Sequence, residues 1–91
     1  MHDIRTLSVI GAGAWGTALA KHAADKGLTV RLWAYEPEVV ASINAGHENR
    51  QFLPGVALPA SLTATTVLRE AVEGVDGILF VVPSHVTRSV L

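Results

Sequence analysis

The sequence predicts an α/β protein built on a parallel sheet with helices on its faces. Three observations indicate this class: short apolar segments alternate with helix-forming segments, glycine or proline separates most of them, and 49% of the 91 residues are hydrophobic. A strand, a helix and a further strand form a parallel pair, because the helix returns the chain to the edge where the first strand began. A charged fraction of 16% and a net charge of −1 argue against a disordered chain and against a nucleic-acid surface.

The first part of the chain predicts a strand, a helix and a second strand. The apolar run at residues 7–10 stops at Gly11, which is typical of a buried strand. Residues 14–26 are rich in alanine and stop before Gly27, so we expect a helix that ends at this glycine. A second strand is expected over residues 28–33. The apolar positions at helical spacing, expected to face the sheet, are Trp15, Ala18, Leu19 and Ala23.

The middle of the chain predicts a helix, an irregular loop and a third strand. Pro37 suits the first turn of a helix that runs to about Ala45. Residues 47–59 contain a proline–glycine pair and a further proline, which are turn signals. Residues 62–66 are rich in threonine, and we expect them to form the third strand.

The last part predicts a short helix, a fourth strand and the start of another helix. The short helix is expected over residues 67–73. Residues 78–82 are the most apolar strand of the chain, and Pro83 ends it. Ser84 is then expected to cap a helix that continues through Val90.

The predicted order of elements corresponds to an incomplete doubly wound sheet. In that topology the first strand is central, the fourth lies beside it, and a fifth flanks the fourth. A fifth strand is missing from the sequence, so residues 78–82 would form an open apolar edge, which promotes aggregation. Leu91 also falls within the pattern of the last helix. We therefore expect residues 1–91 to be the N-terminal portion of a domain in a longer protein.

A glycine-rich loop joins the first strand to the first helix. Its sequence, Gly11-Ala12-Gly13-Ala14-Trp15-Gly16, fits the pattern G-x-G-x-x-G. The first glycine allows a tight turn, the second lets the backbone approach a pyrophosphate, and the third lets helix and strand pack closely. Free amides and the positive end of the helix dipole would then hold the phosphates. This context predicts a Rossmann-type dinucleotide site, against the alternative of a glycine-rich turn that binds nothing.

The end of the second strand bears on which dinucleotide would bind. Folds that bind NAD usually place an acid there for the ribose hydroxyls. Here Ala34 occupies that position and Glu36 follows two residues late, while no arginine stands next to it for a 2′-phosphate. The sequence therefore leaves NAD and NADP both open. Tyr35 is placed to cover the adenine ring, with partial burial against the sheet as the alternative.

Other kinds of site receive little support from the sequence. The chain has no cysteine, which excludes disulfides and thiolate chemistry within it and agrees with a reducing cytoplasm. The spacing of its four histidines matches no metal motif. His47 and His85 follow predicted elements and are weak candidates for acid–base chemistry, and the pairing of His47 with Glu48 more readily fixes the loop before Phe52. No segment is long and apolar enough to suggest a membrane span.

Longer segments resemble the NAD(P)-dependent glycerol-3-phosphate dehydrogenases. The resemblance runs in order along the chain and includes the Trp15-Gly16-Thr17 junction. It continues in Leu32-Trp33 and then in His47-Glu48-Asn49 with Phe52-Leu53-Pro54-Gly55. It ends in Val81-Val82-Pro83-Ser84-His85. The resemblance implies interconversion of sn-glycerol 3-phosphate and dihydroxyacetone phosphate for glycerophospholipid synthesis, with NAD or NADP as the cofactor. It also implies a cytoplasmic protein, a homodimer in full-length form, and a second, all-helical domain.

The resemblance also assigns expected roles to residues. The cofactor-binding residues that it implies are Gly11, Ala12, Gly13, Ala14, Trp15, Gly16, Tyr35, Pro83 and Val86. Tyr35 would lie on the adenosine side, and Pro83 with Val86 near the nicotinamide end. Many bacterial relatives have serine in place of Ala14, so a hydroxyl contact is lost while the backbone amide remains. The catalytic lysine and the substrate-phosphate groups of the family lie further along the chain, so no catalytic residue is assigned.

Two other functions remain open from the residues alone. Another two-domain dehydrogenase, of the 6-phosphogluconate or hydroxyacid type, would share the loop and the helical partner domain. The segment from Phe52 to Gly55 argues against it. A dinucleotide sensor without catalytic activity would also share the loop, although no basic segment suggests a DNA-binding partner domain.

Overall fold

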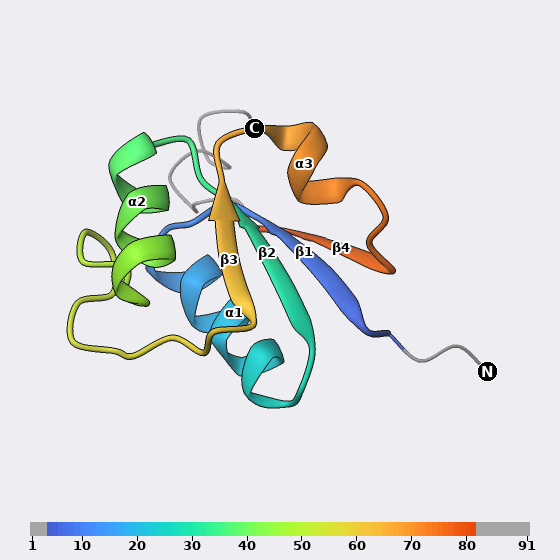
Figure 1. Cartoon of the computed structure of the whole chain (residues 1–91), viewed down its shortest axis with the longest axis horizontal. Helices are drawn as coiled ribbons and strands as arrows, with labels where there is room; N and C mark the ends of the chain where they lie inside the picture. The colour runs from blue at the N-terminus through green and yellow to red at the C-terminus, as the bar shows by residue number, and fades with distance from the viewer. Residues whose placement is uncertain (1–3, 82–91) are drawn as a thin grey trace, which may run out of the picture.

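The computed structural model describes residues 4–81 and shows a four-stranded parallel sheet flanked by helices (Figure 1). In chain order the elements are β1 (Thr6–Ile10), α1 (Ala14–Asp25), β2 (Thr29–Trp33), α2 (Pro37–Gly46), β3 (Leu62–Thr65), α3 (Leu68–Val72) and β4 (Gly77–Phe80). The strand order is β3-β2-β1-β4, with β1 paired to both β2 and β4. The expected α/β class and the expected place of the fourth strand beside the first are confirmed.

Element boundaries differ from the predicted ones by a few residues. The fourth strand begins at Gly77 and ends at Phe80, whereas residues 78–82 were expected. The third helix begins one residue later than expected, because Val67 has an extended backbone and precedes the helix as its N-cap. The predicted strand residue Val82 and the predicted helix after Ser84 lie outside the described residues.

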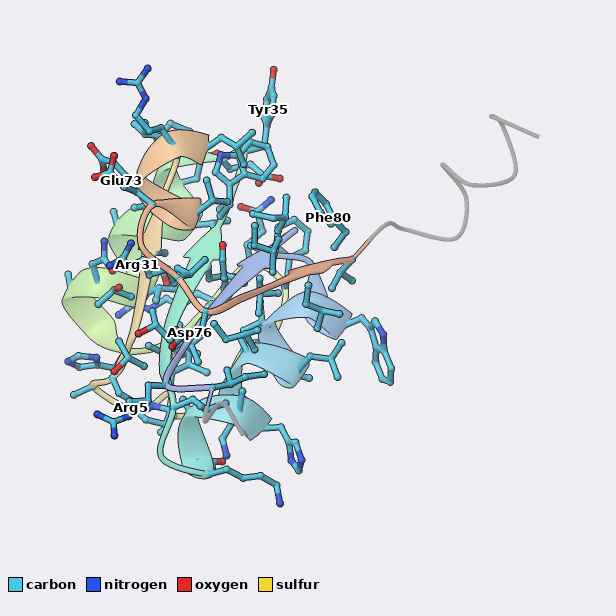
Figure 2. The ribbon with its side chains drawn as sticks, turned by 90° about the vertical axis from the view of Figure 1, so that its right-hand side faces the viewer. Arg5, Arg31, Tyr35, Glu73, Asp76 and Phe80 are labelled. Atoms are coloured by element: carbon cyan, nitrogen blue, oxygen red, sulfur yellow. The ribbon has the colours of Figure 1, made fainter. Side chains whose placement is uncertain are left out.

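The two faces of the sheet differ in polarity. The residues that share one face are apolar and pack with α1 and α2: Leu7, Val9, Val30, Leu32, Leu62 and Ala64. Ser8 and Arg31 lie opposite each other on the other face. Arg31 donates from Nη1 to the carbonyl oxygens of Glu70 and Glu73, which ties β2 to the C-terminal end of α3 (Figure 2). The hydrophobic core therefore lies mainly between the sheet and the first two helices.

The packed face of α1 differs from the predicted one. Its buried residues are Gly16, Thr17, Ala20, Ala23 and Ala24, which are small and recur at helical spacing. Of the four residues expected to face the sheet, Ala23 is buried, and Ala18 and Leu19 are partly buried. The expectation is wrong for Trp15, which is 69% exposed. These small side chains allow α1 to lie very close to the sheet.

Strand β4 lies at one edge of the sheet. It pairs with β1 through the register that matches Leu7 with Gly77 and Ile10 with Phe80. Ile78, Leu79 and Phe80 are exposed on this strand, which agrees with the expected open apolar edge. Within residues 4–81 no further strand joins this edge.

Asp76 joins the beginnings of β1 and β4. Its carboxylate Oδ2 accepts hydrogen bonds from the backbone amides of Arg5 at 2.9 Å and Thr6 at 3.0 Å (Figure 2). Its own amide donates to the Thr6 carbonyl at 2.8 Å. The two amides that point at the carboxylate lower the pKa of Asp76 below its usual value of 3.8, since they stabilise the charged form.

Replacing Asp76 with asparagine should lower the melting temperature of the chain at about pH 7, because two amides lose a charged acceptor. The folded-state pKa lies below the unfolded one, so the carboxylate stabilises the fold above about pH 4 and this stabilisation fades as the pH falls further. Thermal unfolding followed by circular dichroism at about pH 7 and about pH 2.5 would measure both effects. The gap between variant and wild type should be smaller at the lower pH.

Asp25→Asn is the matched control, because Asp25 is an exposed carboxylate whose ion pair joins it to Lys21, one helical turn away. Exposed pairs of this kind contribute little, so its melting temperature should stay close to that of the wild type. An Asp76→Asn gap that does not depend on pH would contradict the role assigned to the carboxylate.

Candidate dinucleotide site

Gly11 turns the chain sharply out of β1. Its φ is +120°, a conformation that L side chains rarely adopt, and a Cβ here would lie 2.5 Å from the carbonyl oxygen of Val81. Its amide donates to the Trp33 carbonyl at 3.1 Å, so the turn is attached to β2 as well as to β1. Only glycine fits this position.

Gly16 brings α1 against the loop. A Cβ on Gly16 would lie 1.8 Å from the carbonyl oxygen of Gly11, well inside any permitted contact. Gly16 is buried, and the neighbouring Thr17 is fully buried. The first and third glycines of the motif are therefore needed by the fold itself.

Gly13 differs from both. Its φ of −66° and ψ of −177° form an extended backbone that other residues also adopt, and a Cβ would meet no atom of residues 4–81 within 4 Å. The fold thus leaves open space in front of Gly13, at the N-terminal end of α1. A side chain is excluded here only if something else occupies that space.

The N-terminus of α1 offers hydrogen-bond donors at this open position. The first helical hydrogen bond runs from the Thr17 amide to the Gly13 carbonyl at 2.9 Å. The amides of Ala14, Trp15 and Gly16 precede it and are directed out of the helix end, where the helix dipole is positive. Gly13 is the N-cap and supplies no side-chain acceptor for them. This arrangement suits a bound anion such as a diphosphate.

A buried asparagine from the loop after α2 contacts the glycine loop. Asn49 is fully buried, and its Nδ2 donates to the Ala12 carbonyl at 2.9 Å and to Thr17 Oγ1 at 2.8 Å. Thr17 Oγ1 itself donates to the same carbonyl at 3.1 Å. Reasoning from the residues did not single out Asn49, which entered only as part of the resemblance. A single asparagine in a loop carries no periodic or spacing signal that could have identified it.

Tyr35 extends from the carboxyl end of β2 into solvent (Figure 2). It is 79% exposed and makes an edge-to-face contact with Trp33, with 6.4 Å between ring centroids. The alternative of partial burial against the sheet is therefore wrong. Trp33 is held in turn by its Nε1, which donates to the Thr66 carbonyl at 3.0 Å. Ala34 occupies the position at which NAD-binding folds usually have an acid. It is fully buried and offers no polar side chain.

The loop after α2 begins with His47 and Glu48. His47 ends α2 in the left-handed conformation, with φ of 51°. Glu48 accepts a hydrogen bond from the Gly55 amide at 2.9 Å, and the His47 carbonyl accepts one from the Leu58 amide at 2.8 Å, so both residues help to fix the loop. The other weak acid–base candidate, His85, and the expected contacts Pro83 and Val86 lie outside the described residues.

Residues 4–81 contain no group of three or more histidine, cysteine, aspartate or glutamate side chains that could hold a metal ion. None of the helices in this range combines the length and the apolar character that a membrane crossing requires.

Comparisons with known proteins agree with the geometry of the loop. The profile of the family described as NAD-dependent glycerol-3-phosphate dehydrogenase N-terminus matches residues 6–91. A glycerol-3-phosphate dehydrogenase [NAD(P)+] of Geobacter metallireducens is 55% identical over 85 residues, which cover 93% of this chain and 25% of the relative.

Solved structures give the same result. A crystal structure of glycerol-3-phosphate dehydrogenase from Coxiella burnetii superposes with a TM-score of 0.81 at 44% identity, covering 89% of this chain and 25% of that one. The enzyme from Saccharomyces cerevisiae also gives 0.81, at 33% identity, with 98% and 29% covered. The chain thus spans about a quarter of the length of these relatives. It belongs to the NAD-dependent glycerol-3-phosphate dehydrogenase family, and it matches the N-terminal part of that family.

Proposed function

We propose that residues 1–91 form the N-terminal portion of the NAD(P)-binding Rossmann domain of a glycerol-3-phosphate dehydrogenase. The whole enzyme would interconvert sn-glycerol 3-phosphate and dihydroxyacetone phosphate, with NAD or NADP carrying the hydride. The observation that carries the proposal is the open space before Gly13, in a loop whose other two glycines are fully accounted for by the fold. The proposed reaction is inferred from family membership, because relatives of this chain are named for it.

The residues of this chain would bind and orient the dinucleotide. The diphosphate would lie over Gly13, with the amides of Ala14 and Trp15 as donors and the dipole of α1 favouring its charge. Ala14 lacks a hydroxyl, so its contact would come from the backbone alone. Tyr35 would cover the adenine. Bound NAD or NADP supplies hydride transfer, while the protein sets its position.

The remaining parts of the proposal rest on the resemblance. Pro83 and Val86 would lie near the nicotinamide end of the cofactor. The catalytic lysine and the groups that hold the substrate phosphate would come from the rest of the enzyme, including an all-helical domain. A cytoplasmic location and a homodimeric whole enzyme are also expected.

The test uses a chimera in which this chain replaces the matching N-terminal quarter of the Geobacter metallireducens relative. We expect the chimera to oxidise NADH or NADPH when dihydroxyacetone phosphate is added, since both halves of the site are then present. Loss of absorbance of the reduced cofactor measures the rate. The isolated 91-residue chain, assayed in parallel, should show no turnover and at most weak cofactor binding. A folded chimera that binds neither cofactor would contradict the proposal.

Two glycine substitutions should separate binding from folding. Gly13→Val should leave the melting temperature of the chimera nearly unchanged, because open space receives the side chain, yet weaken NADH binding at least about tenfold by occupying the diphosphate position. Gly16→Ala should instead destabilise the protein by roughly 3 kcal/mol, at the upper end for overpacking, because backbone cannot easily move aside. Fluorescence titration with NADH and thermal unfolding give the two readouts.

Ala60→Val is the control for these variants, because it introduces a valine at an exposed position before β3, at the opposite end of the sheet from the loop. It should change neither the affinity for NADH nor the melting temperature. If Gly13→Val binds NADH as well as the wild type does, the space before Gly13 is not the diphosphate position.

Replacing Tyr35 with alanine should weaken NADH binding to the chimera about 5- to 100-fold, which corresponds to the stacking of one base on an aromatic ring. The melting temperature should hardly change, because the ring is exposed. Tyr35→Phe keeps the ring and should keep the affinity. Equal losses in both variants would assign the contact to the hydroxyl and not to the aromatic face.

A further inference from the structure

Asn49 reaches the glycine loop from a part of the chain 37 residues further on. Both hydrogens of its amide are used, one on the Ala12 carbonyl and one on Thr17 Oγ1. Its Oδ1 accepts a hydrogen bond from the Phe52 amide at 3.1 Å, and its own carbonyl accepts one from Leu53 at 2.8 Å. Every polar group of this buried side chain therefore has a partner, which fixes its orientation.

The contact with Ala12 determines where the next amide points. The Ala12 carbonyl accepts hydrogen bonds from Asn49 and from Thr17, both fully buried, so it is directed into the protein. In a trans peptide the carbonyl and the amide of the following residue point in opposite directions, and the described chain contains no cis peptide bond. The N–H of Gly13 is therefore directed away from the buried Asn49 and Thr17 side chains. A Cβ on the same residue would meet no atom of the described part of the chain within 4 Å, so space is open beside this peptide.

We propose that Asn49 is a positioning residue of the dinucleotide site, which holds the Ala12–Gly13 peptide so that the Gly13 amide faces the diphosphate. Asn49 does not touch the cofactor and acts only through this peptide. Without the Asn49 amide, the Ala12 carbonyl keeps a single buried donor and the peptide can rotate away from the orientation that binding requires. The loop after α2, residues 47–58, would thereby be coupled to cofactor affinity.

The inference rests on the proposed function, since it concerns the same diphosphate position. A positioning role for Asn49 differs from a contact that only stabilises the fold. Asn44 provides the comparison. Its Nδ2 donates to the Ala64 carbonyl at 2.9 Å, and its Oδ1 accepts from the Ala64 amide at 2.8 Å. These bonds join α2 to β3 and do not involve the glycine loop. Both asparagines join distant segments, but only Asn49 holds the glycine loop.

The experiment compares Asn49→Ala with Asn44→Ala in the chimera. Asn49→Ala should raise the KM for NADH about tenfold, the cost of one buried hydrogen bond, while kcat at saturating NADH stays within about twofold of the wild type. The inhibition constant of ADP-ribose, which contains the diphosphate, should rise in parallel, and that of adenosine should not change. Asn44→Ala should lower the melting temperature and leave all three constants as they were.

Several results would overturn the inference. One is an unchanged KM for NADH together with an unchanged inhibition constant of ADP-ribose in Asn49→Ala. Another is an equal loss of adenosine binding, which would indicate general damage to the site. If the wild-type chimera binds ADP-ribose but turns over no dihydroxyacetone phosphate, the proposed reaction fails while the role of Asn49 is still decided by the ADP-ribose constants.

A second measurement needs no variant and covers the case in which Asn49→Ala does not fold. In the wild-type chimera labelled with 15N-glycine, the amide proton of Gly13 should move downfield when ADP-ribose is added, because it becomes a hydrogen-bond donor to phosphate. Gly55, whose amide is already bonded to Glu48, should not move. A Gly13 signal that does not respond to saturating ADP-ribose would overturn the proposed orientation.

Discussion

The close contact between the glycine loop and α1 is the constraint on which this part of the molecule depends. The Gly11 carbonyl lies where a side chain on Gly16 would be, so the helix can approach β1 only with a glycine at that position. This approach places the N-terminal end of α1 at the carboxyl edge of the sheet, in front of an open space. It also explains why the rest of the buried helix face consists of threonine and alanine, since larger residues would push the helix away.

Part of this arrangement was predicted correctly from the sequence. The order of elements, the parallel sheet and the loop follow from short-range signals: glycine at turns, alternation of apolar segments, and proline at the start of α2. The packed face of α1 was misjudged because large apolar residues were assumed to be buried. Trp15 is instead exposed beside the loop, since helix and strand are too close to accommodate an indole ring between them.

The contacts that join distant segments of the chain were not predicted from the sequence. Asn49 contacts Ala12, and Asp76 caps the amides of Arg5 and Thr6 at the start of β1. Each is a polar residue in a connecting segment, and nothing in its neighbours indicates a partner far away in the chain. Only the folded arrangement brings them together, because segments that are neighbours in a parallel sheet are far apart in the sequence.

Strands that pair in this sheet are far apart in the sequence, and this affects how the chain folds. During synthesis β1 can first pair with β2, which lies about two dozen residues further along the chain. It can pair with β4, its other neighbour in the sheet, only after residue 76 has been synthesised. Pairings this distant in sequence form slowly, because a long stretch must be closed before any contact compensates for the lost entropy. During synthesis the central strand would therefore remain half-paired until most of this segment has left the ribosome, a period in which chaperones could bind its exposed edge.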